Sequence, residues 1–180
     1  MIAVIDTETN WRDQVMSVGM VIARSDTLEP VEWHYRVLAP EHEVGGMYDG
    51  ALCLEAPETV VCSRQEALTF LTGRLRQYGA TRLFAYNACF DRNHLPELRG
   101  YRWYDIMRIA AYRQTNPAIP AAADCCSTGR LKRGYGVEAM LRLLSGECGY
   151  RETHNALDDA LDELRLMRLL GHSVHTYIPL

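Results

Sequence analysis

The first part of the chain alternates short apolar runs with polar turns, which is the pattern of a β-meander. Residues 1–5 form a wholly apolar run, typical of a strand that is buried on both faces. Residues 18–23 and 31–38 are also strand-like, and the turn-prone pair Ser25 and Asp26 lies between them. We therefore expect three sequential antiparallel strands.

A helix is predicted after this meander. Ser63 and Glu66 have the spacing of a capping box, apolar residues follow at helical intervals, and Gly79 supplies a stop. The rest of the chain alternates strand-like and helical segments. These are a strand at 83–86, a short helix from about Ala88 that Pro96 limits, a strand and helix within 101–112, and helices at 136–144 and 156–170. A meander followed by such alternation predicts an α/β fold with a mixed sheet and helices on its faces.

Length and composition favour one globular domain spanning residues 1–180. Hydrophobic residues make up 48% of the chain and charged residues 23%, which excludes disordered and fibrous classes. No apolar run approaches the roughly 18 residues that span a bilayer, and a basic segment typical of a signal peptide is missing. We therefore expect a cytoplasmic protein whose six cysteines are reduced thiols. The net charge of −4 argues against coating nucleic acid by bulk electrostatics but permits an enzyme that grips a few nucleotides.

Two carboxylates, Asp6 and Glu8, follow the first apolar run directly. Residues two apart on an extended chain point to the same side, so both can reach one ion. The end of a buried central strand is also where open α/β sheets place their sites. A polar turn that terminates the strand would explain the same two residues, so this motif alone does not define a function.

Asp91 lies just past the fourth apolar run, in the first turn of a predicted helix. His154 and Asp159 form a third group, and five residues of regular helix would place them well over 100° apart. They can share a site if His154 lies in the loop before the helix and Asp159 lies one turn in, with Thr153 or Asn155 as the N-cap. Each group also has a structural explanation, since acids favour the first turn of a helix.

Taken together, the three groups resemble the motifs of the DEDDh 3′–5′ exonucleases, a family that includes ribonuclease T and the proofreading subunit of bacterial DNA polymerase III. The family's motifs read Asp-x-Glu, Asn-x-x-Phe-Asp and His-x-Ala-x-x-Asp. This chain has DTE at 6–8, NACFD at 87–91 and HNALDD at 154–159, and residues 104–110 resemble a further family segment. The resemblance covers residues 1 to about 170 and implies a ribonuclease H-like fold.

The resemblance implies a metal-dependent exonuclease that hydrolyses phosphodiester bonds from the 3′ end of single-stranded DNA or RNA and releases nucleoside 5′-monophosphates. Converging carboxylates repel one another without cations, and all-oxygen ligands select Mg²⁺ or Mn²⁺. Two ions about 4 Å apart would orient the attacking water and stabilise the leaving oxygen.

The family also implies a role for each residue of the site. Asp6 would bridge both ions, Glu8 and Asp159 would complete the shell of one, and Asp91 would hold the other partly through water. His154 would act as general base, because imidazole exchanges protons near neutral pH. The substrate-binding residues would be Glu8, Thr9 and His154, with Thr9 and the Glu8 backbone on the terminal nucleotide.

Two segments depart from the family pattern. Residues 17–21 read SVGMV where the family usually has an acidic or amide residue before its Ile-Gly-Ala. Residues 114–134 form a long connection that ends in a basic cluster, Arg130, Lys132 and Arg133, and it fits either a substrate-contacting loop or a solvated surface loop. Cys125 and Cys126 lie in it, but adjacent cysteines lack the usual spacing of zinc ligands.

Two other functions remain open at this stage. One is a binding module that has lost catalysis and holds nucleic-acid ends or a polymerase, although such a protein would usually lack one of the five residues. The other is a phosphodiesterase for dinucleotides or very short oligonucleotides, which need few phosphate contacts. The choice between DNA and RNA depends on contacts to a single 2′-oxygen that the sequence does not locate.

Overall fold

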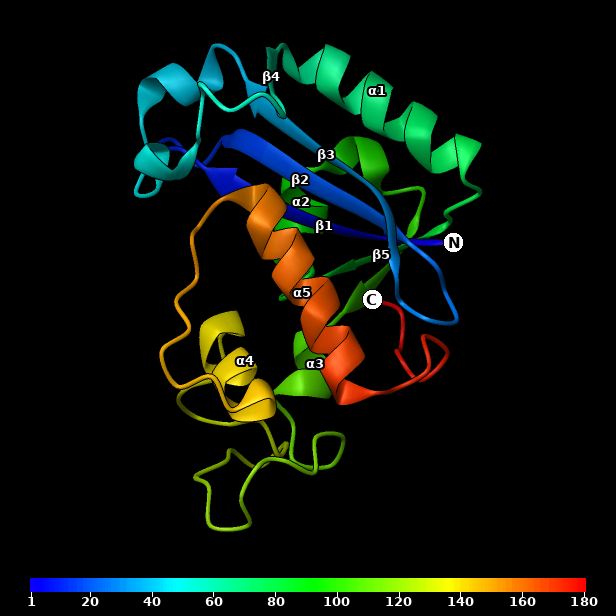
Figure 1. Ribbon diagram of the computed structural model, residues 1–180, viewed down its shortest axis with the longest axis vertical. Coiled ribbons are helices and arrows are strands. Elements are labelled where there is room, and N and C mark those ends of the chain that lie inside the picture. Colours follow the sequence, from blue (N-terminus) through cyan, green and yellow to red (C-terminus); the bar gives the residue numbers. More distant parts are fainter.

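A mixed six-stranded sheet with helices on both faces forms the body of the protein, which the computed structural model describes over residues 1–180 (Figure 1). The strand order is β4-β3-β2-β1-β5-β6. The strands are β1 (Ile2–Thr9), β2 (Val15–Ala23), β3 (Pro30–Leu38), β4 (Thr59–Cys62), β5 (Arg82–Ala85) and β6 (Arg102–Asp105). The helices are α1 (Arg64–Gln77), α2 (Cys89–His94), α3 (Met107–Ala110), α4 (Val137–Ser145) and α5 (Ala156–Leu170), with short 3₁₀ turns η1 (Glu41–Val44), η2 (Asp49–Ala51) and η3 (Pro96–Leu98).

The central strand β1 pairs with β2 in antiparallel and with β5 in parallel orientation. The predicted antiparallel meander β1-β2-β3 and the α/β class are confirmed. The first strand is longer than its apolar run, because backbone pairing continues from Asp6 opposite Gly19 to Glu8 opposite Ser17. The prediction that Asp6 and Glu8 follow the strand is therefore wrong: both lie within it.

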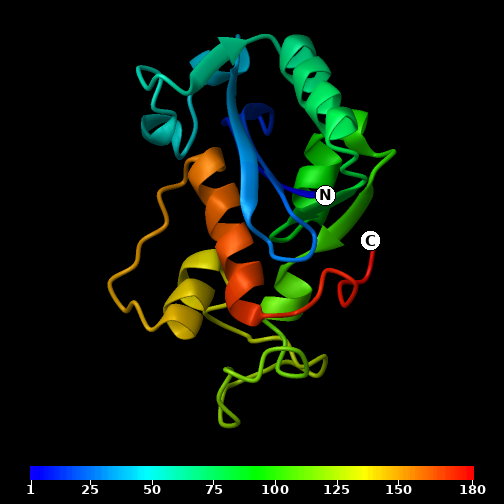
Figure 2. The same ribbon diagram turned by 45° about the vertical axis from the view of Figure 1, so that its right-hand side comes forward.

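Each face of the sheet is covered by different helices, which lie on opposite sides of the strands in Figures 1 and 2. Helix α5 packs on one face, where Ala160 and Leu164 are buried against Val4 and Val21. Helix α1 covers the other face with Leu71 and its neighbours. Helix α4 packs on the outer side of α5, in a third and smaller core.

The close packing of α5 on the sheet depends on Gly19, which pairs with Asp6. A Cβ atom added at Gly19 would lie 2.0 Å from the carbonyl oxygen of Ala156, the first residue of α5. Only glycine lets the first turn of α5 approach β2 this closely. The packing therefore fixes where the start of α5 meets the middle of β1.

We expect Gly19→Ala to lower the free energy of unfolding by at least about 1–3 kcal/mol, the usual cost of overpacking a core. Gly73→Ala is the matched control, because nothing lies within 4 Å of its added Cβ and the position is inside α1. In that control the free energy of unfolding should rise by up to about 1 kcal/mol, because alanine has a higher helix propensity than glycine. Urea unfolding of both variants measures the difference, and equal stability would contradict the close approach.

The capping box predicted for α1 is present: the Ser63 hydroxyl accepts from the Glu66 backbone N–H, and the Glu66 carboxylate accepts from the Ser63 N–H. The strand before it, β4, was not predicted. It has four residues, pairs on one side only, and exposes Val60 and Val61. A short edge strand of this kind has neither the buried alternation nor the length that reveals a strand in sequence.

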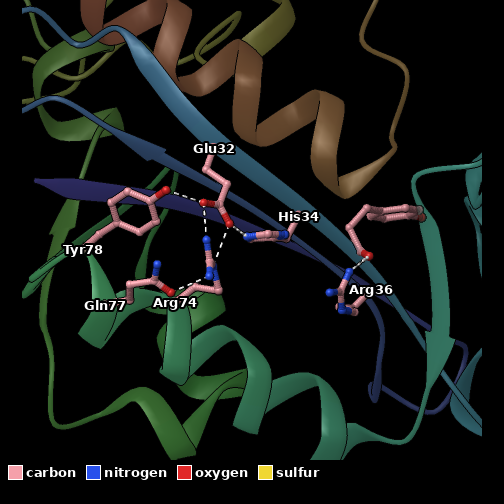
Figure 3. A network of polar contacts seen from close by, with 7 residues as sticks. Glu32, His34, Arg36, Arg74, Gln77 and Tyr78 are labelled. Atoms are coloured by element: carbon pink, nitrogen blue, oxygen red, sulfur yellow. Dashed lines mark hydrogen bonds and ion pairs between the residues drawn. The ribbon is translucent and has the colours of Figure 1, made fainter.

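A polar network fastens α1 to β3 (Figure 3). Arg74 and Tyr78 both donate to the carboxylate of Glu32, and His34 also contacts it. The hydrogen bond from Arg74 is the main cause that lowers the pKa of Glu32 to about 2. Because these groups satisfy one another at the edge of the α1–sheet interface, we interpret the network as structural.

The connection between α3 and α4 is anchored at both ends although it is largely irregular. Isolated bridges pair Tyr112 with Arg130 and Cys125 with Leu131. All six cysteines of the chain are free. None of the helices combines the length and hydrophobicity needed to cross a membrane.

Candidate active site

The alternation of β1 places its polar residues on two faces. Asp6 and Glu8 share the face of Val4, which α5 covers, whereas Thr7 shares the opposite face with Ile5. The two carboxylates thus point toward the start of α5. This same-side arrangement is the one that their spacing predicts.

Asp91 reaches the same region from helix α2, which follows β5, the strand that pairs with β1. It lies in the first turn of α2, shortly after β5, and its side chain is buried. The hydroxyl of Thr7 donates to its Oδ1 at 2.8 Å. The residue between the two β1 carboxylates therefore fixes the carboxylate of α2.

The start of α5 places the third motif. Asn155 is the N-cap, and its Oδ1 accepts from the backbone N–H of Leu157 at 3.0 Å. His154 precedes the cap with a φ of 57°, and Asp159 follows in the first turn with its side chain buried. Asp158 is exposed and accepts from the hydroxyl of Thr153 at 3.1 Å. The structure thus has the loop-then-helix arrangement that the spacing requires.

Glu8, His154 and Asp159 come together in space. One potential ligand atom from each lies within 4.8 Å of those of the other two. The imidazole of His154 stacks on the ring of Tyr48, with 3.8 Å between ring centroids and 15° between planes. Tyr48 therefore holds the imidazole at the edge of the acidic cluster, a contact that no sequence motif indicated.

The carboxylates of this site are electrostatically strained. Burial, reinforced by the negative charge of Asp159, raises the pKa of Glu8 to about 8. Burial also raises the pKa of Asp159 to about 8, and that of Asp91 above its ordinary value. The pKa of Asp6 rises well above its usual range because of burial and then the charges of Asp91, Asp159 and Glu8.

Two further carboxylates surround the site, and the sequence analysis missed both. Glu163 lies one turn after Asp159 on α5, is 1% exposed, and leaves its Oε2 without a hydrogen-bond partner. Its i, i+4 spacing from Asp159 on an expected helix could have revealed it. Glu152 precedes the helix, and its backbone N–H donates to Glu138 at 3.2 Å. No motif includes Glu152, so only the fold shows that it faces the cluster.

The donor set fits hard divalent cations. Buried oxygens of Asp6 and Asp159 have no hydrogen-bond partner, and none of Asp6, Glu8, Asp91 and Asp159 forms an ion pair with lysine or arginine. Burying uncompensated carboxylates is costly. Oxygen-only ligands at high charge density are what Mg²⁺ and Mn²⁺ select.

Comparison with solved structures identifies the fold. The chain is similar to the nuclease domain of 3′hExo, a DEDDh family member solved with rAMP bound, with a TM-score of 0.67, 13% identity, and coverage of 99% of this chain and 95% of that one. It is similar to a full-length 3′-exonuclease with a TM-score of 0.64, 13% identity, and coverage of 99% and 89%. It is also similar to Exonuclease I from Methylocaldum szegediense, with a TM-score of 0.56, 16% identity, and coverage of 94% of this chain and 40% of that one.

The predicted resemblance to DEDDh exonucleases is thus confirmed at the level of the ribonuclease H-like fold. No protein-family model and no curated protein sequence matches the chain.

Proposed function

We propose that the protein is a metal-dependent 3′–5′ exonuclease that releases nucleoside 5′-monophosphates from single-stranded nucleic acid. The observation that carries the proposal is the convergence, on this fold, of four uncompensated carboxylates from three separated segments beside one histidine. A purely structural cluster of this kind would be expected to contain balancing cations.

The residues that would hold divalent ions are Asp6, Glu8, Asp91 and Asp159, with Asp6 central because it is influenced by the other three. When bound, two such ions supply electrostatic stabilisation of the attacking and leaving oxygens in phosphodiester hydrolysis. Thr7 keeps Asp91 oriented toward the cluster through its 2.8 Å hydrogen bond.

His154 is proposed as the general base. Its imidazole lies at the edge of the cluster within reach of Glu8 and Asp159, and stacking on Tyr48 limits its rotation. A water beside the scissile phosphate would lose its proton to this imidazole. The outcome is hydrolysis at the 3′-terminal phosphodiester bond.

The terminal nucleotide would lie where β1 ends. Thr9 is the last residue of β1 and directly follows Glu8, whose carboxylate belongs to the cluster. Trp11 follows in the turn with an indole that is 67% exposed. An exposed aromatic ring two residues after the end of β1 suits stacking with a base.

One assay tests the proposed function directly. Labelled single-stranded DNA, single-stranded RNA, their duplexes and a dinucleotide are incubated with Mg²⁺, Mn²⁺ or EDTA. We expect single strands to shorten stepwise from the 3′ end with either metal and to stay intact in EDTA. Binding without cleavage would favour the binding module, and cleavage of the dinucleotide alone would favour the short-substrate phosphodiesterase.

His154→Ala is expected to lose at least about 10²-fold in kcat, the usual contribution of a general base. It should retain Mn²⁺ binding, measured by calorimetry, because the carboxylates remain. His175→Ala is the matched control, since that histidine is exposed near the C-terminus. Full activity of His154→Ala would remove the assigned role.

A further inference from the structure

The segment that joins α3 to α4 carries aromatic and basic side chains, Arg130, Arg133 and Tyr135, that are not part of the hydrophobic cores. Both ribbon views show it projecting past α4 (Figures 1 and 2). The second half of this segment is held to the end of α3 by the isolated bridge between Tyr112 and Arg130. The backbone N–H of Leu131 also donates to the Ala111 carbonyl. The residues that follow, up to the start of α4, are exposed.

A hydrogen bond ties this exposed stretch to the candidate active site. The hydroxyl of Tyr86 donates to the backbone carbonyl of Tyr135. Tyr86 directly precedes the second motif, and burial, followed by the charges of Asp105, Glu163 and Glu152, raises the pKa of its hydroxyl. Glu152 also acts on Asp6. Tyr135 therefore contacts the residue that directly precedes the second motif, although it lies outside all three motifs in sequence.

The side chains here form an aromatic and cationic surface. The guanidinium carbon of Arg130 lies 4.8 Å from the ring centroid of Tyr135, and that tyrosine is 37% exposed. Arg133 is exposed, and neither arginine forms an ion pair. Lys132 differs, because its Nζ lies 3.0 Å from Asp124. The basic cluster of the sequence thus divides into two arginines without an ion pair and one lysine that pairs with Asp124.

We propose that Arg130, Arg133 and Tyr135, called here the Tyr135 platform, bind the part of a single-stranded nucleic acid that lies 5′ of the terminal nucleotide. The inference rests on the proposed function and adds a binding surface to it. A base stacks on the exposed face of Tyr135, and the two arginines contact backbone phosphates. Stacking on an aromatic ring beside arginines is how single strands are held without sequence preference.

Charge complementarity supports this occupant. The protein has a net charge of −4, and its candidate site is lined by carboxylates, so a polyanionic strand needs local cations to approach. The platform supplies two unpaired arginines on the segment that contacts Tyr86, the residue before the second motif. The hydrogen bond between Tyr86 and Tyr135 is the observed contact between this segment and the chain just before the second motif, and the proposed nucleic-acid strand would follow it.

The test compares two substrates that differ only in whether they extend beyond the terminal nucleotide. The p-nitrophenyl ester of thymidine 5′-monophosphate contains that nucleotide alone, and a 5′-labelled 12-mer of single-stranded DNA extends past it. The variants are Tyr135→Ala, Tyr135→Phe, Arg130→Ala and Arg133→Ala, with Lys132→Ala as the matched control from the same segment. Thermal melting of each verifies folding.

For the 12-mer we expect Tyr135→Ala and Arg130→Ala to raise KM at least about fivefold, the fold-change that corresponds to about 1 kcal/mol of lost stacking. Tyr135→Phe keeps the aromatic ring, so its KM for the 12-mer should stay close to the wild-type value. Lys132→Ala should also have the wild-type KM. Hydrolysis of the p-nitrophenyl ester should stay within about twofold in all variants. Salt titration of 12-mer binding, followed by fluorescence anisotropy, should lose about 0.7 in slope in Arg130→Ala and Arg133→Ala but not in Lys132→Ala.

Unchanged KM for the 12-mer in the Tyr135 and Arg130 variants overturns the platform, and so does an equal loss on both substrates, which would indicate a role at the reacting phosphate or in folding. Failure of the proposed function looks different. In that case the wild-type protein itself hydrolyses neither substrate with Mg²⁺ or Mn²⁺.

Discussion

Asp159→Asn is expected to lower kcat at least about 100-fold, while Asp158→Asn retains nearly full activity. The structure separates the two adjacent residues, because Asp159 is 3% exposed and faces Glu8 and His154. Asp158 is exposed and bonds to Thr153. Losing one anionic ligand removes several kcal/mol of transition-state stabilisation, and each ~1.4 kcal/mol is tenfold in rate.

The pair of variants is its own control, since both remove one charge from the first turn of the same helix. Asp158→Asn should lose only a dipole contribution to the free energy of unfolding, about 0.3–1 kcal/mol. Steady-state rates at saturating Mn²⁺ decide the matter. If Asp158→Asn is the inactive variant, the third motif is assigned to the wrong aspartate.

The second large effect is expected in how metal and pH act on stability. The pKa values of Glu8 and Asp159 are raised to about 8 in the folded protein, above those of an unfolded chain. The folded state therefore binds protons more tightly than the unfolded state between about pH 4 and 8. In EDTA, the free energy of unfolding should fall as pH rises from 5 to 8, because this stabilisation is lost as the pH approaches the folded pKa.

Mn²⁺ should reverse that trend. Metal binding competes with protons for the same oxygens, so the rise in Tm produced by millimolar Mn²⁺ should grow from pH 5 to pH 8. Asp159→Asn should shrink both the fall in EDTA and the gain with Mn²⁺, and Asp158→Asn should shrink neither. Melting curves at matched ionic strength that do not respond to Mn²⁺ at pH 8 would be incompatible with a shared cation site.

The elements that the sequence predicts well are those with local determinants. The capping box at Ser63 and the apolar stripe of α5 depend on neighbouring residues, so their pattern is visible in the chain itself. β4 forms because it pairs with β3, and β1 continues past its apolar run because β2 pairs with it. Such pairing is a tertiary effect that overrides local hydrophobicity.

The same distinction applies to the candidate site. Motif spacing singled out Asp6, Glu8, Asp91, His154 and Asp159. Tyr48 and Tyr135 could not be found that way, because Tyr48 stacks on His154 and Tyr135 accepts from Tyr86 across segments distant in sequence. Glu152 lies only two residues before His154, but no motif includes it, and the fold alone shows that its charge acts on Glu8. The Gly19 contact belongs to the same class, since its importance depends on a backbone atom of α5.

Mass spectrometry of the products formed in ¹⁸O-labelled water tests the central claim most directly. A single-stranded oligonucleotide is incubated with the wild-type protein and Mn²⁺, with Asp159→Asn as the inactive control. We predict nucleoside 5′-monophosphates that carry one ¹⁸O in the phosphate, together with a ladder of strands shortened one nucleotide at a time from the 3′ end. Internal fragments, release of inorganic phosphate alone, or the same products in EDTA would contradict an exonuclease whose carboxylates act through divalent cations.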